Sequence, residues 1–119
     1  MDDATNVSEH DLGHLRRCIE LAQEARDRGD HPFGSVVVTT DGRVVEGRNS
    51  VVTRRDPTGH AETNVVRDAA ARLAPEELAV STLYTSTAPC AMCAGAIYWS
   101  GIPRVVFALS ESELARIVA

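Results

Sequence analysis

The amino-acid sequence predicts a three-layer α/β/α sandwich built around a mixed sheet. Three observations lead to this expectation: helical and strand-like segments alternate along the chain, one tight turn joins two strands, and helices separate the later strands. A tight turn produces an antiparallel pair, whereas strand–helix–strand units produce parallel strands through right-handed crossovers. Helices then cover both faces of the sheet. The length of 119 residues suits one domain, residues 1–119.

A helix followed by a hairpin is expected in the first part of the chain. Ser8 is a candidate N-cap residue, and apolar residues repeat at helical spacing after it, which predicts a helix over about residues 9–28. The β-branched run at 35–40 predicts a buried strand. Asp41-Gly42 is a strong hairpin turn, so residues 43–48 are expected to return as a second strand.

Helices and strands alternate in the remainder of the chain. After a loop at 49–59, a helix is expected to begin near His60, and Pro75 ends it or opens a short turn afterwards. The elements that follow are a strand at 79–86, an alanine-rich helix at 90–100 closed by Gly101, a strand at 104–109 and a final helical turn or two from Ser110. These units supply the parallel part of the expected sheet.

Composition and charge narrow the classes of function. No apolar run approaches the roughly 20 residues that span a bilayer, and the acidic, polar start differs from a signal peptide. Three cysteines, two of them in one Cys-x-x-Cys, argue against a disulfide framework and for a reducing compartment. We therefore expect a cytoplasmic protein that does not contact a membrane. With a net charge of −5, the chain lacks the basic character of nucleic-acid-binding proteins, so a small-molecule substrate is expected.

Two of the predicted helix starts carry residues with metal chemistry. One carries His60-Ala61-Glu62, and the other carries Pro89-Cys90-Ala91-Met92-Cys93. One imidazole and two thiols are ligands suited to zinc, and thiols at positions i and i+3 of a helical turn face the same point. Three protein ligands leave a coordination position for water, whereas structural zinc sites have four. We therefore predict that His60, Cys90 and Cys93 bind Zn²⁺ as a catalytic metal.

Glu62 is the expected catalytic residue. A carboxylate close to metal-activated water takes its proton and returns it to the substrate nitrogen and the leaving group. Together, the metal and Glu62 predict hydrolytic removal of an amino group from an amidine-like carbon. Two alternatives stay open at this point: a redox pair formed by Cys-x-x-Cys alone, and a structural zinc site whose shell is completed by Glu62 or a distant histidine.

The same motifs resemble those of the cytidine deaminase superfamily, whose zinc signature has this histidine, glutamate and cysteine pattern. The resemblance extends from about residue 32 to residue 109 and includes Pro32-Phe33-Gly34, the loop at 49–59 and Ala94-Gly95-Ala96-Ile97-Tyr98-Trp99. Within the superfamily, the chain is most similar to the bacterial guanine deaminases, whose second-cysteine helix typically continues into Gly-Ala-Ile-Tyr-Trp. The resemblance implies a hydrolase of nucleobase metabolism that acts on guanine or a related heterocycle.

The resemblance also implies substrate contacts and an assembly. Phe33 and Trp99 should flank the base, Asn49 should form a hydrogen bond with it, and the backbone N–H of Ala61 should bind the ring carbonyl. A homodimer is expected. Family members usually continue for several tens of residues beyond the position of Ala119, so the fold is expected to lack their C-terminal strand and helix.

Two other functions remain compatible with the sequence. The tRNA adenosine deaminases, which convert adenosine to inosine, share the zinc signature and the Asp56-Pro57-Thr58 approach to the histidine. They usually lack the Tyr-Trp pair after the shared Gly-Ala, and they are more basic than this chain. The other alternative is a catalytically silent, zinc-binding domain with the deaminase fold.

Overall fold

The computed structural model describes residues 7–109 of the chain. Its helices and strands follow the expected order, with one short helix added after the second long one. The elements are α1 (Glu9–Asp27), β1 (Gly34–Val38), β2 (Val44–Arg48), α2 (Ala61–Arg72), α3 (Pro75–Leu78), β3 (Thr82–Thr87), α4 (Ala91–Ser100) and β4 (Arg104–Leu109). The final helical turn expected from residue 110 lies outside the described residues.

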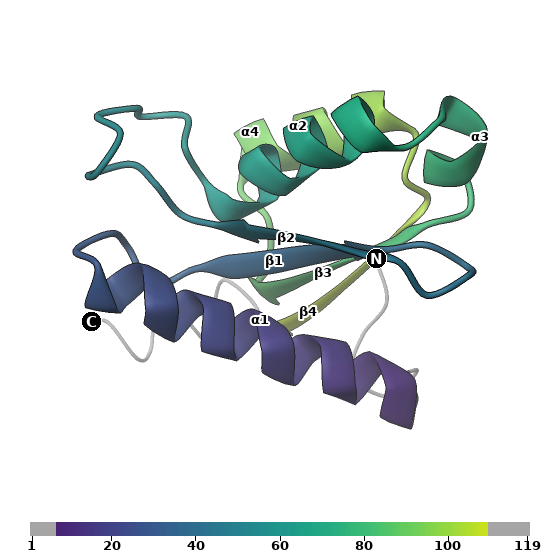
Figure 1. The fold of residues 1–119 in the computed structure, drawn as a ribbon, viewed down its shortest axis with the longest axis horizontal. Coiled ribbons are helices and arrows are strands. Elements are labelled where there is room, and N and C mark those ends of the chain that lie inside the picture. The colour runs from purple at the N-terminus through teal and green to yellow at the C-terminus, as the bar shows by residue number, and fades with distance from the viewer. Residues whose placement is uncertain (1–6, 110–119) are drawn as a thin grey trace.

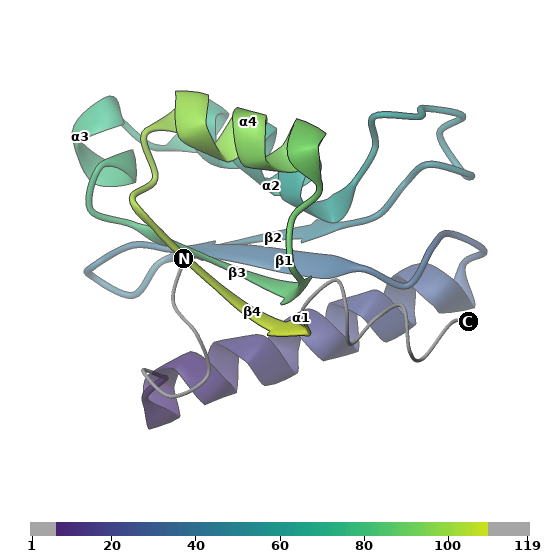
Figure 2. The same ribbon diagram turned by 180° about the vertical axis from the view of Figure 1, so that it is seen from behind.

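The four strands form one mixed sheet in the order β2-β1-β3-β4. Strand β1 is antiparallel to both β2 and β3, and β3 is parallel to β4. Helix α1 covers one face of the sheet, and α2, α3 and α4 cover the other (Figures 1 and 2). The expected three-layer sandwich around a mixed sheet is therefore confirmed.

The strand expected from residue 79 begins three residues later, at Thr82. Residues 79–81 continue the turn that follows α3, because their backbone N–H groups donate to the carbonyls of Pro75, Glu77 and Leu78. Backbone donors used in this turn are not available for a strand ladder. The β-branched residue Val80 therefore lies in a turn rather than in the sheet.

Helix α1 begins with a capping box and packs closely on β1. The Ser8 hydroxyl accepts from the backbone N–H of Asp11, and the Asp11 carboxylate accepts from the backbone N–H of Ser8. Gly34 lies against the helix, where an added Cβ would approach the carbonyl oxygen of Cys18 to 2.4 Å and the Cβ of Leu21 to 2.5 Å. Only glycine permits this separation between α1 and the sheet.

A network of polar side chains joins α1 to strands β3 and β4. The buried carboxylate of Asp11 accepts hydrogen bonds from the Tyr84 hydroxyl on β3 and, at 3.0 and 2.8 Å, from the Arg104 guanidinium on β4. The hydrogen bond from Arg104 is the main cause that holds the pKa of Asp11 well below its ordinary value. Charge pairing thus joins α1 to β4.

An apolar core lies between the sheet and the helices α2 and α4. Its fully buried members include Val37, Val65 and Leu83, which come from β1, α2 and β3. Burial of such side chains stabilises the fold by about 1.5–3 kcal/mol each, before the loss of chain entropy is counted. No helix among residues 7–109 is both long and apolar enough to cross a membrane.

Candidate metal centre and adjoining pocket

The N-terminal ends of α2 and α4 meet and bring three metal-ligating side chains together. His60 is the N-cap residue of α2, Cys90 is the N-cap residue of α4, and Cys93 lies in the first turn of α4. The Nδ1 atom of His60 lies 3.5 Å from the Sγ atom of Cys90 and 3.6 Å from the Sγ atom of Cys93. All three donor atoms lie within 4.8 Å of one another.

These separations fit one zinc ion. Tetrahedral zinc lies about 2.3 Å from sulfur and about 2.0 Å from nitrogen, so its sulfur and nitrogen ligands are about 3.5 Å apart. Burial raises the pKa of the Cys93 thiol to about 12, although the Thr63 hydroxyl at 3.3 Å from its sulfur opposes this rise. A cation held among the donors offsets the cost of a buried thiolate, and helix N-termini favour the same charge. The residues therefore suit the metal in chemistry as well as in geometry.

Glu62 faces a cavity of about 260 Å³ next to these donors. Its side chain is 5% exposed, and burial raises its pKa to about 7 against a hydrogen bond from its own backbone N–H. A carboxyl group with such a pKa can both accept and donate a proton near neutral pH. The cavity is lined by His31, Phe33, Asn49, His60, Glu62, Thr87, Ala88 and Cys90.

Asn49 lines the cavity with a fixed orientation. Asn49 is 1% exposed, and its Oδ1 atom accepts a hydrogen bond from the backbone N–H of Val51 at 3.0 Å. Both backbone groups of Asn49 also form hydrogen bonds. Its N–H donates to the carbonyl oxygen of Phe33, and its carbonyl oxygen accepts from the Arg28 guanidinium at 2.7 Å. Since Oδ1 is engaged, the amide nitrogen is the group that Asn49 can offer to a ligand.

A buried aspartate, Asp30, holds the loop that connects Asn49 to the metal ligands. Its Oδ1 atom accepts from the backbone N–H groups of Val52 and Thr53, and its Oδ2 atom accepts from the Thr53 hydroxyl and from Arg28. Burial by itself would raise the pKa of Asp30, but the hydrogen bonds from Thr53 and Arg28 outweigh it and lower the pKa to about 2. Arg28 thus links this carboxylate to the backbone of Asn49.

The structure brings most of the expected site residues together, but not Trp99. Phe33 lines the cavity, and Ala61 is the first residue of α2, where backbone N–H groups have no partner within the helix. Trp99 is 83% exposed, packs edge-on against Tyr98 and does not line the cavity. Six residues of helix after Cys93 rotate its direction by about 240°, so it faces away from the metal ligands.

Several residues that the fold adds to the site have little or no signal in the sequence. Thr63 contacts the Cys93 sulfur, and Thr87 and Ala88 line the cavity at the end of β3. His31 also lines it, and its place directly before Pro32-Phe33-Gly34 was the one local signal available. Asp30 had no signal, because the backbone N–H groups that it binds, those of Val52 and Thr53, lie more than twenty residues later in the chain.

Comparison with known proteins gives related sequences with three different stated substrates. A probable cytosine deaminase from Schizosaccharomyces pombe is 45% identical over 114 residues, covering 96% of this chain and 69% of that protein. The guanine deaminase of Bacillus subtilis is 44% identical over 102 residues, covering 85% of this chain and 65% of that protein. A tRNA-specific adenosine deaminase from Haemophilus influenzae is 40% identical, covering 98% of this chain and 68% of that protein. This chain thus spans about two thirds of their length.

The fold and a family model agree with these relatives. The X-ray structure of the Bacillus subtilis guanine deaminase superposes with a TM-score of 0.82 at 40% identity, covering 90% of this chain and 69% of that one. Residues 8–109 match the family described as the cytidine and deoxycytidylate deaminase zinc-binding region. That range contains His60, Glu62, Cys90 and Cys93. The chain therefore belongs to the zinc-dependent cytidine and deoxycytidylate deaminase family.

Proposed function

We propose that this protein is a hydrolytic deaminase of a free nucleobase or a related heterocycle, with guanine as the favoured substrate. The observation that carries the proposal is the buried carboxyl group of Glu62 in the cavity beside the three donors of His60, Cys90 and Cys93. The group of donor atoms within 4.8 Å of one another does not include Glu62, which argues against a structural zinc site whose shell Glu62 completes. The donor set of three also leaves one coordination position for chemistry.

The proposed reaction divides the work between the metal ligands and Glu62. When zinc is bound by His60, Cys90 and Cys93, it supplies Lewis-acid chemistry that makes water nucleophilic near neutral pH. Glu62 takes a proton as water adds to the amino-bearing carbon of the substrate and delivers it to the neighbouring ring nitrogen. A second proton passes through Glu62 to the amino group, the carbon–nitrogen bond breaks, and ammonia leaves as the carbon becomes a carbonyl.

The neighbouring residues supply binding and orientation in this proposal. Asn49 donates from its amide nitrogen to an acceptor on the base, because its Oδ1 atom is already bonded to Val51. Phe33 offers one aromatic face, and the N–H of Ala61 binds the carbonyl oxygen of the base as charge develops on it. A cavity of this size, with aromatic and amide groups on its wall, favours a single heterocycle.

Ammonia release from a panel of substrates tests the proposal. The panel contains guanine, cytosine, adenine, cytidine and a tRNA anticodon stem-loop, each with the zinc-loaded protein. We expect turnover of guanine or another free base. Turnover of the stem-loop alone would replace the proposal by tRNA adenosine deamination. No turnover of any substrate by protein with stoichiometric zinc would favour a catalytically silent domain.

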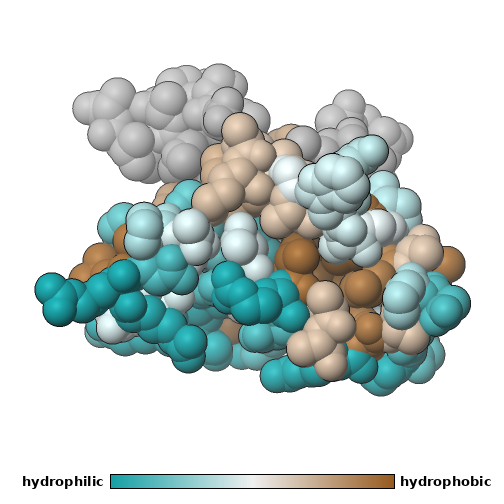
Figure 3. Space-filling model, turned by 90° about the horizontal axis from the view of Figure 1, so that it is seen from above, coloured by the Kyte–Doolittle hydropathy of each residue, from teal (hydrophilic) through white to brown (hydrophobic). Residues whose placement is uncertain are grey.

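We also infer that the protein forms a homodimer through α4. The outer side of this helix exposes Met92, Tyr98 and Trp99, and large apolar or aromatic side chains are enriched at protein interfaces. Figure 3 views the helical layer, on which apolar residues in brown and tan lie among hydrophilic ones. Light scattering should give twice the mass of the chain, and Trp99→Ser should shift the protein towards a monomer. A wild-type protein that stays monomeric at high concentration would contradict this inference.

A further inference from the structure

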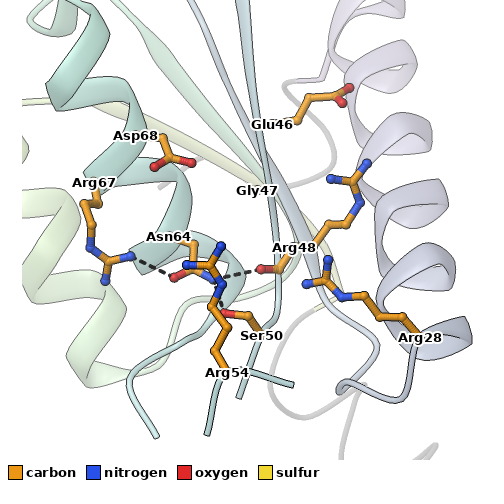
Figure 4. A pocket seen from close by; sticks show the side chains of 9 residues that line it. All are labelled: Arg28, Glu46, Gly47, Arg48, Ser50, Arg54, Asn64, Arg67 and Asp68. Carbon is orange, nitrogen blue, oxygen red and sulfur yellow. Dashed lines mark hydrogen bonds between the residues drawn. The ribbon is translucent and has the colours of Figure 1, made fainter. Parts of the chain in front are cut away.

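A second pocket is lined by Arg48 and Ser50, the two chain neighbours of Asn49 (Figure 4). Its volume is about 190 Å³, and it shares no lining residue with the cavity around Glu62. The C-terminal end of α1, strand β2, the loop after it and helix α2 contribute to its wall. The lining residues are Arg28, Glu46, Gly47, Arg48, Ser50, Arg54, Asn64, Arg67 and Asp68.

Positive charge gathers in this pocket although the whole chain is acidic. Four arginines and two carboxylates line it, whereas the chain carries a net charge of −5. Glu46 is already paired with Arg17 outside the pocket, with 2.6 Å between the charged atoms. Arg17 thus compensates the charge of Glu46, and Asp68 is the lining carboxylate that remains to oppose the four arginines.

Two of the four arginines have no carboxylate of residues 7–109 within ion-pair distance, although the charge of both helps to lower the pKa of Asp56. Arg28 is paired with Asp30 at 2.7 Å, and Arg48 is paired with Glu24 at 2.5 Å. Within residues 7–109, Arg54 and Arg67 form no ion pair. Figure 4 shows the Arg54 side chain pointing from its loop into the pocket. Two guanidinium groups are thus available to an anion.

Hydrogen bonds hold the side chain of Asn64, which lines the pocket, in one orientation. Its amide nitrogen donates to the carbonyl oxygen of Arg48 at 2.8 Å and to the Ser50 hydroxyl oxygen at 2.9 Å. With the nitrogen held, its Oδ1 atom accepts from the Arg67 guanidinium at 3.0 Å. This contact uses one of the five N–H donors of Arg67 and orients the others, so part of the entropy cost of binding is met before a ligand arrives.

We propose that this pocket binds a compact oxyanion of the phosphate class, either inorganic phosphate or the phosphate group of a small monoester. Guanidinium forks match phosphate oxygens in pairs, which lysine cannot do, and all 12 basic residues of this chain are arginine. The pocket has a volume of about 190 Å³, which suits one such group. The net charge of −5 on the whole chain disfavours an extended polyanion that would reach beyond the pocket. Size and charge therefore favour a small ligand over a nucleic-acid backbone.

Calorimetric titration of the zinc-loaded full chain tests this site. Inorganic phosphate, adenosine monophosphate and an RNA hairpin are the probes, and sodium chloride keeps the ionic strength constant. The first two probes distinguish a free phosphate ligand from a monoester. We expect saturable binding of at least one of them, and at least tenfold weaker binding by the double variant Arg54→Gln/Arg67→Gln.

The double variant Arg16→Gln/Arg72→Gln is the matched control, because it removes the same charge from exposed arginines outside the pocket. It should bind within about twofold of the wild type. Equal weakening of both variants, no saturation by either small probe, or binding of the hairpin alone would overturn the proposal. In NMR spectra, phosphate should shift the signals of Ser50 and the Asn64 side-chain amide. Shifts confined to His60 and Glu62 would place the ion at the metal centre and also overturn it.

Discussion

The Nδ1 atom of His60 lies 3.5 Å from the Sγ atom of Cys90, although thirty residues separate the two in the sequence. Each residue is the N-cap of its helix, so the contact joins the N-terminal ends of α2 and α4. This meeting point lies beside β3, whose last residue lines the same cavity. A metal held there would fasten two helices to each other as well as take part in chemistry.

Removal of zinc should therefore lower stability as well as activity. We expect a chelator to lower the melting temperature by about 10 °C or more, since metal binding is coupled to folding of the site. Differential scanning calorimetry measures the change, and added zinc should restore the original value. The Cys93→Ala variant should melt at the same temperature with and without chelator. A wild-type melting temperature that does not change on complete removal of zinc would contradict a site built from these donors.

Replacement of Glu62 by glutamine should separate catalysis from metal binding. The amide keeps the shape of the side chain but cannot carry protons, so kcat should fall by about 10²–10⁴-fold. Metal analysis should still find one zinc ion per chain. Glu76→Gln, an exposed change on α3, is the control and should keep full activity. Full activity in the Glu62→Gln variant would exclude the proton-transfer role.

Asp30→Asn should weaken substrate binding from a distance. The amide cannot accept all of the hydrogen bonds that reach Asp30 from Val52, Thr53 and Arg28, so the loop after Asn49 should lose its fixed position. We expect KM to rise about tenfold with a smaller change in kcat, and the melting temperature to fall. Asp27→Asn, at an exposed position, should change neither value. Loss of kcat with an unchanged KM would argue against this positioning role.

Stability in acid should depend on Asp11. Its pKa is lowered in the folded protein, so its contribution is complete above the ordinary value of 3.8 and is lost as the pH falls below that value. At pH 7, Asp11→Asn should reduce the free energy of unfolding by about 2–3 kcal/mol, as expected for hydrogen bonds to a charged group.

Urea unfolding of the wild type and the variant measures this dependence. The difference between the two should narrow as the pH falls from 5 to about 3. Asp68→Asn, an exposed change, should leave the free energy of unfolding nearly constant over the same range. A difference for Asp11→Asn that stays the same at every pH would show that the carboxylate charge is not the cause.

Gly34, which packs against α1, and Gly13, which lies within α1, should respond to alanine in opposite directions. Gly34→Ala places a Cβ against the backbone of α1 and should cost about 1–3 kcal/mol of unfolding free energy. Gly13→Ala meets no atom within 4 Å inside α1 and should stabilise the protein by about 0.5–1 kcal/mol. Thermal unfolding of both variants checks the contrast. A stable Gly34→Ala protein would mean that α1 can move away from the sheet.

The fold was largely predictable from the sequence, because hydrophobic spacing and turn residues act between near neighbours. The bounds of α1, the Asp41-Gly42 turn and β4 followed from such local patterns. The start of β3 did not, since residues 79–81 use their backbone donors in a turn after α3. Hydrogen bonding there outweighs the strand propensity of Val80.

The donor types of the metal centre were also evident in the sequence, since His60 and Cys-x-x-Cys carry that chemistry wherever they lie. Their distances, the buried state of Glu62 and the exposure of Trp99 were decided by the tertiary structure. The same is true of Asp30 and the arginine pocket, whose members come from separate elements. The physical reason is that sequence patterns report interactions within a few residues. Crossovers between strands and helices determine which distant side chains line the same cavity, form an ion pair or bind the same metal.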